Sequence, residues 1–284
     1  MKLKGAEIVW ECLTREGVEV VFGYPGGANM PIYDAMLNYP VHHVLVRHEQ
    51  GAAHMADGYA RASGKVGVAM ATSGPGATNL VTGICTAMMD SVPTVFITGQ
   101  VAAHLIGGDA FQETDVTGIT LPITKHNYLV TRADQIAETI REAFYIARSG
   151  RPGPVLIDVC KNAQIESCEF VFPEDVKLPG YQPVLRSPKN LVDQAVELIE
   201  RAKKPIILCG HGVLMSKAEE ELMQFAVKTQ TPVASMLLGL GAFPASNELS
   251  LGMMGMHGEA HTNLAVQNSD LILAFGMRFD DRVT

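Results

Sequence analysis

The sequence predicts an α/β protein: a parallel sheet flanked by helices, followed by a second α/β domain that is incomplete. Short apolar runs alternate along the chain with longer segments in which apolar residues recur at helical spacing. The runs are continuously apolar, which is typical of strands buried on both faces of a parallel sheet. The 27 glycines and the charged fraction of only 18% suit a chain with many tight strand-to-helix turns.

The first predicted domain covers residues 1–165, and the same patterns locate its elements in order. Strands are predicted at residues 18–22, 44–46, 65–72, 93–98, 127–131 and 155–159. Helices are predicted at residues 5–16, 30–37, 52–60, 80–89 and 134–148, while residues 113–122 are ambiguous. The segment 134–148 is the clearest helix, because Ile136, Ile140 and Phe144 fall on one face.

Residues 166–188 are predicted to be a linker, because Pro173, Pro179 and Pro183 interrupt a stretch without helical period. The second domain, residues 189–284, is predicted to contain helices at 189–203 and 217–228 and strands at 205–209, 232–235 and 270–275. About three strands are visible in this pattern. We therefore expect the second domain to be incomplete.

Composition narrows the class of protein. The 22 basic and 30 acidic residues give a net charge of −8, and no basic cluster suggests a nucleic-acid surface. No apolar run reaches the length of a membrane span, and the first residues lack a signal-peptide core. The five cysteines are odd in number and form no C-x-x-C pair, which favours buried thiols in a reducing cytoplasm. These features predict a cytoplasmic protein without nucleic-acid or membrane partners.

Glu49 is the first candidate for chemistry. It lies in Arg47-His48-Glu49-Gln50-Gly51, between a short apolar strand and a helix with apolar residues at 52, 53, 56 and 60. Ligands usually bind at this junction, the carboxyl edge of a parallel sheet. The alternative is that Glu49 is a first-turn acid favoured by the helix dipole, and taken alone that alternative is preferred.

Two glycine-rich turns strengthen the prediction of a ligand site. Gly23-Tyr24-Pro25-Gly26-Gly27-Ala28 follows a strand, where adjacent glycines permit close approach of the backbone to a ligand or form an ordinary tight turn. Ser73–Asn79 precedes a helix, whose free N–H groups suit a polar or anionic group. It is neither a P-loop nor a nucleophile elbow, because the lysine and the flanking glycines that those motifs require are missing.

Weaker signals occur in the second half. Gly210-x-Gly212 follows a strand as in a dinucleotide fingerprint, but Met215 occupies the position of the third glycine, so an ordinary turn is favoured. His257 and His261 are four residues apart, yet the intervening Gly258 weakens a zinc-binding helix. We predict no metal ligands in this chain. Lys161, just after a strand, is on this evidence a solvated surface lysine.

Taken together, these segments resemble the acetohydroxyacid synthase (acetolactate synthase) large catalytic subunits, a family of thiamine-diphosphate enzymes. The motifs that carry the resemblance are Phe22–Ala28, Arg47–Gly51, His54–Ala62, Thr72–Asn79, Asp109–Glu113, Thr124–Asn127, Gly255–Gly258 and Gly276–Val283. Several of these motifs are shared by the wider thiamine-diphosphate superfamily. Ala-Phe-Gln-Glu and Arg-Phe-Asp-Asp-Arg-Val narrow the resemblance to the synthase, which would give residues 1–165 a pyrimidine-binding role and residues 189–284 an FAD-binding role.

The resemblance implies roles for individual residues. Glu49 would bond N1′ of the cofactor's aminopyrimidine and favour its imino tautomer, Gln112 would lie near the reacting centre, and Lys161 matches an active-site lysine. Cys160-Lys161-Asn162 departs from the family's Pro-Lys-Asp. The other residues implied for thiamine diphosphate are Tyr24, Pro25, Gly27, Ala28, Pro75, Gly76 and Asn79. Those implied for FAD are Arg151, Gly210, Gly212, Met236, Leu237, Met254, Gly255, Met256, His257, Gly276, Met277, Arg278, Phe279 and Asp280.

The implied activity is decarboxylation of pyruvate and its condensation with a second 2-keto acid, pyruvate or 2-ketobutyrate, the first common step of isoleucine and valine biosynthesis. The resemblance also implies a homodimer or tetramer formed through the pyrimidine domain, and a small regulatory subunit. The family's Gly-Asp-Gly motif and downstream asparagine, which hold Mg²⁺, do not occur in this sequence. We therefore expect the Mg²⁺ ligands in a further domain and expect this chain alone to be inactive.

Three alternatives remain open at this point. Another pyruvate-using thiamine-diphosphate enzyme, either a flavin-free catabolic acetolactate synthase or a pyruvate oxidase, shares several of the motifs. The third alternative is a truncated, non-catalytic chain that acts only by association.

Overall fold

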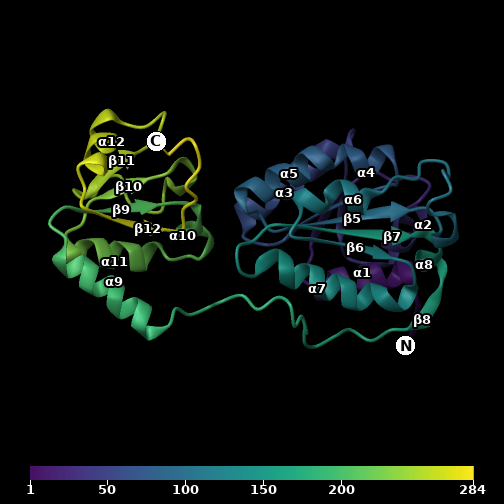
Figure 1. The fold of residues 1–284 in the computed structure, drawn as a ribbon. Coiled ribbons are helices and arrows are strands. Elements are labelled where there is room, and N and C mark those ends of the chain that lie inside the picture. Colours follow the sequence, from purple (N-terminus) through teal and green to yellow (C-terminus); the bar gives the residue numbers. More distant parts are fainter. Residues whose placement is uncertain (284) are drawn as a thin grey trace. The chain divides into compact units, whose positions relative to one another are not determined.

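The computed structural model describes residues 1–283, and the chain divides into two compact units between Leu185 and Arg186 (Figure 1). Each unit is built on its own parallel sheet. None of the helices in the described part of the chain combines the length and the apolar character needed to cross a bilayer.

The sheet of the first unit has six parallel strands in the order β3-β2-β4-β5-β7-β6. Its central strands are completely buried, in agreement with their continuous apolar runs. The strands are β2 (Val20–Gly23), β3 (His42–Leu45), β4 (Gly67–Ala71), β5 (Thr94–Gln100), β6 (His126–Val130) and β7 (Pro154–Cys160). This confirms the predicted α/β class.

Helices cover both faces of this sheet (Figure 1). In β5, Val95 and Ile97 face the core formed with α1 (Gly5–Arg15) and α7 (Ile136–Arg148), whereas Phe96 faces the core formed with α3 (Glu49–Ser63) and α5 (Val81–Asp90). The alternate side chains of a strand point to opposite faces, so each face receives its own apolar layer. Four short helices lie at strand ends: α2 (Met30–Ala35), α4 (Pro75–Asn79), α6 (Val116–Thr120) and α8 (Lys161–Ile165).

Two sequence expectations need correction in this unit. The run Val44–Val46 was expected to be a buried strand, but β3 is the edge strand of the sheet and Leu45 is 60% exposed. An edge strand has a neighbour on one side only. Residues 113–122, ambiguous in the sequence, contribute α6 and the start of a 3-10 turn at Leu121–Ile123.

Residues 166–185, within the expected linker, lie on the first unit. Strand β8 (Ser167–Glu169) pairs antiparallel with β1 (Lys2–Lys4). Beyond β8, Phe170 and Phe172 pack beside the guanidinium of Arg15, at 5.1 and 5.5 Å from the ring centroids. We call residues 170–183 the strap.

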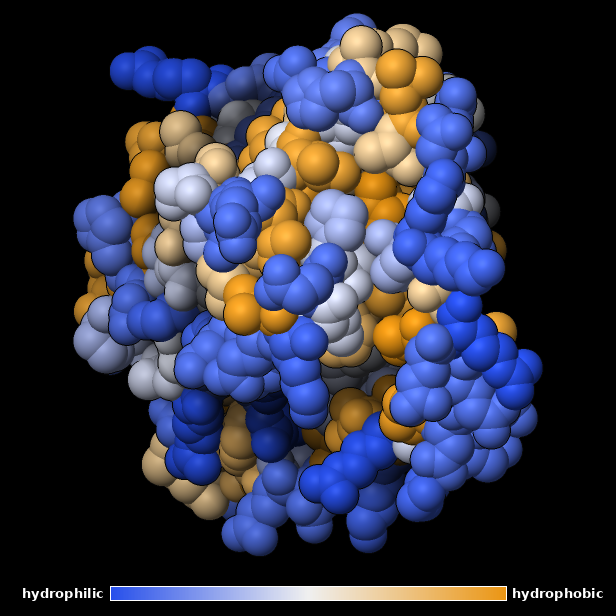
Figure 2. Space-filling model, turned by 90° about the vertical axis from the view of Figure 1, so that its left-hand side faces the viewer, coloured by the Kyte–Doolittle hydropathy of each residue, from blue (hydrophilic) through white to orange (hydrophobic). Residues whose placement is uncertain are grey.

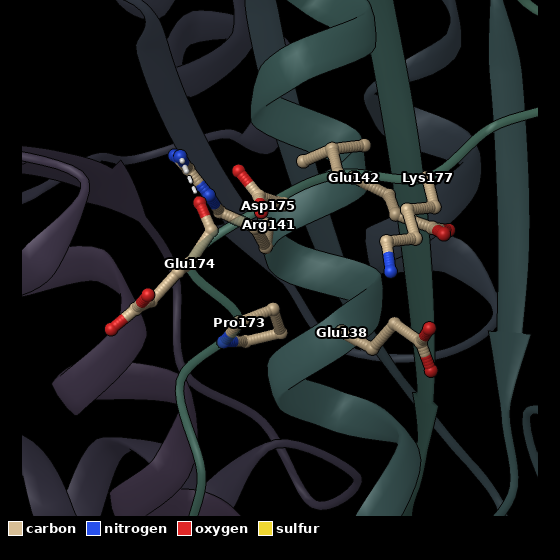
Figure 3. Close-up of a pocket in the computed structure, with 8 residues that line it drawn as sticks. Glu138, Arg141, Glu142, Pro173, Glu174, Asp175 and Lys177 are labelled. Carbon is tan, nitrogen blue, oxygen red and sulfur yellow. Dashed lines mark hydrogen bonds between the residues drawn. The ribbon is translucent and has the colours of Figure 1, made fainter.

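The strap and α7 enclose a hollow of ≈ 330 Å³. Figure 3 shows Glu138 and Glu142 of α7 opposite Glu174 and Lys177 of the strap, with Arg141 donating a hydrogen bond to the Glu174 carbonyl at 3.4 Å. This hollow lies on the α7 side of the sheet, whereas α3, which begins with Glu49, covers the other face.

The second unit has four parallel strands in the order β11-β10-β9-β12, one more than predicted. The strand missed in the sequence is β11 (Ser250–Met253), which contains Gly252 at φ +80° and pairs irregularly with β10 (Val233–Ser235). The other elements are β9 (Pro205–Cys209), β12 (Leu271–Phe275), α9 (Lys189–Arg201), α10 (His211–Met215), α11 (Glu219–Thr229) and α12 (Ala260–Gln267). Figure 2 shows apolar side chains, in orange, exposed among polar ones on this unit.

Candidate functional site

The carboxyl edge of the six-stranded sheet carries the candidate site. All six strands run in the same direction, so the segments that follow β2, β3, β4, β5 and β7 emerge at one edge. Glu49 is the first residue of α3, directly after the cap residue His48, whose Nδ1 accepts a hydrogen bond from the Gln50 N–H at 3.1 Å. The Glu49 side chain is largely buried, at 9% exposed.

Two other predicted residues, Asn79 and Gly76, lie next to the Glu49 carboxylate. Its Oε2 accepts a hydrogen bond from Asn79 Nδ2 at 2.9 Å. A Cβ added to Gly76 would lie 3.2 Å from Glu49 Oε1 and 2.8 Å from Thr72 Cγ2. Glycine at position 76 therefore leaves space beside the second carboxylate oxygen, where a ligand atom can approach.

Side chains from distant segments fix the loop at residues 26–29. Asn29 Oδ1 accepts from the Gly26 N–H at 2.8 Å, and Thr72 Oγ1 accepts from the Ala28 N–H at 3.1 Å. Gln164, completely buried on α8, donates to the Ala28 carbonyl at 2.7 Å. Gly27 has open space where a Cβ would stand. The backbone at Gly27 and Ala28 is thus rigidly held and accessible at Gly27.

A second polar group lies behind Glu49. The Tyr33 hydroxyl is buried and has no hydrogen-bond partner among the described residues, as is the case for Asn29 Nδ2. Burial, and then the Glu49 carboxylate, raise the pKa of Tyr33. Tyr33 therefore stays neutral and is available as a hydrogen-bond donor.

Gln112 comes to the same edge on the loop that follows β5. Gln112 adopts φ +58°, and a Cβ added to Gly74 would lie 2.7 Å from the Gln112 carbonyl oxygen. Gly74 itself has φ +57° and caps α4. The structure therefore brings Gln112 against the turn that contains Gly76 and Asn79. The adjacent Phe111 is 88% exposed.

Two further predicted residues of this unit, Lys161 and Arg151, lie apart from one another. Lys161 begins α8 at the carboxyl end of β7, and its side chain is exposed. Arg151 precedes β7 and donates from Nε to Ser91 Oγ at 2.7 Å. Because β7 has seven residues, Arg151 and Lys161 lie at opposite edges of the sheet, about 23 Å apart along the strand.

Apart from Arg151, which belongs to the first unit, the residues implied for FAD lie at the carboxyl edge of the second sheet. The Gly212 N–H donates to the Gly276 carbonyl at 2.8 Å, and a Cβ at Gly212 would lie 2.6 Å from Gly276 Cα. The Met256 N–H donates to the Arg282 carbonyl at 2.9 Å, and Asp280 pairs with Arg278 at 2.9 Å. The loops after β9, β11 and β12 are therefore joined, and the glycines at 210 and 212 permit their contact.

Thr72 and Gln164 were missed as individual candidates in the sequence. Thr72 sits in a quoted motif but carries no chemical signal by itself, and Gln164 lies in an unremarkable helix turn. Both side chains bond the backbone of Ala28, which is 44 positions from Thr72 and 136 positions from Gln164 along the chain. No local sequence pattern encodes such distant contacts. Within residues 1–283, no three His, Cys, Asp or Glu side chains gather closely enough to hold a metal ion.

The arrangement suits a nitrogen heterocycle. A buried carboxylate with one oxygen bonded to the Asn79 amide and the other next to Gly76, a position without a side chain, can bind a ring N–H. Beside it lie rigid backbone at Gly27 and an unpartnered buried hydroxyl at Tyr33. The residues present thus fit the aminopyrimidine of thiamine diphosphate.

Comparisons with known proteins agree with this geometry. Residues 3–119 match the N-terminal TPP-binding domain of thiamine pyrophosphate enzymes, and residues 192–284 match the central domain of the same enzymes. The chain is 52% identical over 284 residues to the acetolactate synthase large subunit of Corynebacterium glutamicum, covering 100% of this chain and 45% of that protein. It is 51% identical over 286 residues to that of Haemophilus influenzae, covering 100% and 50%.

A plant protein, acetolactate synthase 3, chloroplastic, of Brassica napus, is 53% identical over 284 residues, covering 99% of this chain and 43% of that protein. The chain thus spans about half the length of the curated relatives it matches. The chain therefore belongs to the thiamine pyrophosphate enzymes and is homologous over its whole length to their acetolactate synthase large subunits.

Proposed function

We propose that this chain supplies the pyrimidine-binding part of an acetolactate synthase active site, which decarboxylates pyruvate and condenses it with pyruvate or 2-ketobutyrate. The observation that carries the proposal is the buried Glu49 carboxylate, bonded to Asn79 on one oxygen and next to the glycine at position 76 on the other. Sequence identity of about half over the whole chain with acetolactate synthase large subunits supports this enzyme over a pyruvate oxidase or a flavin-free synthase.

In this proposal Glu49 bonds the pyrimidine ring and holds a proton on it. Tyr24, Pro25, Gly27, Ala28, Pro75, Gly76 and Asn79 line the ring. When bound, thiamine diphosphate supplies the electron sink that stabilises the charge left as carbon dioxide departs. Gln112 faces the reacting centre, and Lys161 lies at the rim of the site. The protein's contribution is orientation and exclusion of water.

We further propose that FAD binds at the carboxyl edge of the second sheet. Leu237, Met256 and Phe279 expose apolar side chains there, at 68%, 54% and 66%, and these suit a flat aromatic ring. Gly255, at φ +102°, lets its loop reach this edge. The remaining contacts proposed in this unit are Gly210, Gly212, Met236, Met254, His257, Gly276, Met277, Arg278 and Asp280. Arg151, which belongs to the first unit, remains a prediction from the resemblance. Flavin that co-purifies with the chain would test this assignment independently of activity.

For Mg²⁺ we propose ligands outside this chain, as the resemblance implies, and we derive no step through the ion. As partner we propose a second copy of the chain, since Tyr24, Met30, Leu45 and Phe111 expose apolar surface in the segments near Glu49. A small regulatory subunit and a cytoplasmic location remain predictions from the resemblance and the composition.

The test is a chimera in which residues 1–284 replace the matching part of the Corynebacterium glutamicum large subunit. We expect it to form acetolactate from pyruvate, and we expect Glu49→Gln to lower the rate about 100-fold or more, because an amide cannot replace the carboxylate in proton exchange. The matched control is Glu138→Gln, since Glu138 is an exposed first-turn acid of α7. Equal activity of the two variants would show that Glu49 only complements a helix dipole.

A further inference from the structure

A buried carboxylate lies beneath the candidate site without a part in the proposed chemistry. Asp158 is on the central strand β7 and is 1% exposed. Its Oδ1 accepts from Thr98 Oγ1 at 2.7 Å, and its Oδ2 accepts from Gln100 Nε2 at 2.8 Å. Both partners belong to the neighbouring strand β5, where Thr98 is paired directly with Asp158.

Gln100 connects Asp158 to the loop that follows β5. It is the last residue of β5 and is 3% exposed. Its Nε2 also donates to the Thr114 carbonyl at 2.9 Å, and its Oε1 accepts from the Val101 N–H at 2.8 Å. Val101 and Thr114 are the two ends of the loop that carries Gln112. One side-chain amide therefore ties both ends of this loop together.

Asp158 and the Thr114 carbonyl together determine which way the Gln100 amide faces. A carboxylate is only an acceptor, so it requires the NH₂ group of Gln100 on its side. The oxygen of the amide then faces Val101, whose backbone N–H donates a hydrogen bond to it. If the Gln100 amide were flipped, its oxygen would face the Asp158 carboxylate and its NH₂ group would face the Val101 N–H, so both hydrogen bonds would be lost.

The interior of the loop is also ordered, by Glu113. The Glu113 carboxylate accepts hydrogen bonds from the backbone N–H groups of Gly107 and, at 3.1 Å, Ala110. These backbone donors, the Gly107 N–H first, lower the pKa of Glu113, which therefore stays ionised. Gln112 directly precedes Glu113 in this loop, and its carbonyl oxygen lies close to Gly74.

We infer that Gln100 and Asp158 are positioning residues that hold the loop of residues 101–114 in the shape that presents Gln112. The inference rests on the proposed function in one respect, namely that Gln112 faces the reacting centre. The hydrogen bonds that join Asp158, Gln100 and the two ends of the loop, which we call the tie, are a property of the folded chain. A fixed loop avoids the loss of rate that a displaced catalytic group causes.

Hydrogen exchange on the 284-residue chain tests these hydrogen bonds of Gln100 directly. We expect Gln100→Leu to speed amide exchange in residues 101–114 about tenfold or more, because each end of the loop loses a buried hydrogen bond. The matched control is Gln135→Leu: Gln135 Oε1 accepts from the N–H groups of Thr131 and Arg132, both at 3.1 Å. That variant should affect only the segment around residues 131–135. Unchanged exchange of 101–114 in Gln100→Leu would overturn the inference.

Three further variants cover the case in which Gln100→Leu does not fold. Asp158→Asn keeps the shape of the side chain but removes one of the two acceptors that orient the Gln100 amide, leaving the Thr114 carbonyl, so exchange in 101–114 should rise by less than in Gln100→Leu. Gln100→Glu places two carboxylates together, and adding Asp158→Asn gives residue 100 a donor again. The double variant should therefore regain protection at Val101 but not at the Thr114 end. Equal exchange at both ends, or no rescue, would contradict the assignment.

The chimera separates this inference from the proposed function. If both hold, Gln100→Leu lowers kcat about tenfold more than Gln135→Leu does, with a smaller change in KM for pyruvate. If acetolactate synthesis is wrong but the tie is right, the exchange results stand and Glu49→Gln has no effect. If only the tie is wrong, Glu49→Gln still abolishes activity while Gln100→Leu behaves as its control does.

Discussion

Glu49 differs in its surroundings from the other acids in first helical turns. Glu7 of α1 folds back to accept from the Lys4 N–H at 2.7 Å, which caps its own helix. Glu138 of α7 is exposed. Glu49 is buried and is bonded to Asn79, 30 residues along the chain. The helix dipole accounts for an acid in these positions but not for this burial, so the contact with Asn79 supports a binding role.

Asp158 gives a prediction about pH. Burial raises its pKa to about 6 from 3.8, while the hydrogen bonds from Thr98 and Gln100 oppose the rise and Asp115 adds to it. The folded state therefore binds the proton more tightly than the unfolded chain does. The stabilising contribution is complete below about pH 4 and is lost as the pH rises through about 6, with a total of about 3 kcal/mol.

The measurement is urea unfolding of the wild type and of Asp158→Asn between pH 4.5 and 7.5. Trp10 is the single tryptophan and is completely buried in the first unit, so its fluorescence reports that unit alone. The free energy of unfolding of the wild type should fall relative to that of the variant as the pH rises. Parallel curves would mean that Asp158 titrates in its ordinary range.

The sequence predicts Glu49 from its place between a strand and a helix and Gln112 from the family resemblance alone, and the structure brings both to the carboxyl edge of the first sheet. The sequence could not indicate Gln100, Asp158 or Gln164 as positioning residues, because their importance lies in pairing across strands and in contacts between helices. Thr98 and Asp158 are 60 residues apart and meet only through the register of β5 and β7. A buried acid within an apolar strand was the one available signal for Asp158.

At the scale of elements, burial determined which strands could be predicted. The strands β4, β5 and β7 are buried along their whole length, so their sequences are continuously apolar. In contrast, β1 and β8 are three-residue strands with an exposed residue at each end, and β11 contains a glycine. Short polar strands pair because the folded unit brings them together, and neither composition nor period marks them.

The helix α3 offers a prediction about stability. Gly58 lies in its exposed interior, and a Cβ added there would meet nothing within 4 Å. Gly58→Ala should therefore stabilise the first unit by about 0.5–1 kcal/mol, by removing the conformational cost of glycine in a helix.

The comparison variant is Gly83→Ala in α5, where a Cβ would lie 2.3 Å from the Cβ of Ala53 on α3. This variant should destabilise the unit, because the two helices must separate. Both changes are followed by Trp10 fluorescence during urea unfolding. Equal effects would mean that the contact between α3 and α5 does not limit the spacing of the helices.

At the scale of the molecule, the strap belongs to the first unit in spite of its proline-rich sequence. Lys125 Nζ donates to the Tyr181 hydroxyl at 3.0 Å and to the Ser149 carbonyl at 2.8 Å. Tyr181 in turn donates to the same carbonyl at 2.8 Å. The absence of helical period correctly indicated irregular backbone, but aromatic residues spaced along such a segment can still pack on a domain.

This packing predicts where the first unit can be cut. A chain of residues 1–185 keeps β8 and the strap, whereas residues 1–165 lose the pairing of β1 with β8 and the contacts of Phe170 and Phe172 with Arg15. We expect the shorter chain to be less stable by about 2–4 kcal/mol, from lost apolar burial and cation–π contacts. Urea unfolding followed by Trp10 fluorescence measures the difference. The longer chain should reproduce the Trp10 transition of the 284-residue chain. Equal midpoints for the two shortened chains would show that the strap contributes nothing to the stability of the sheet that it covers.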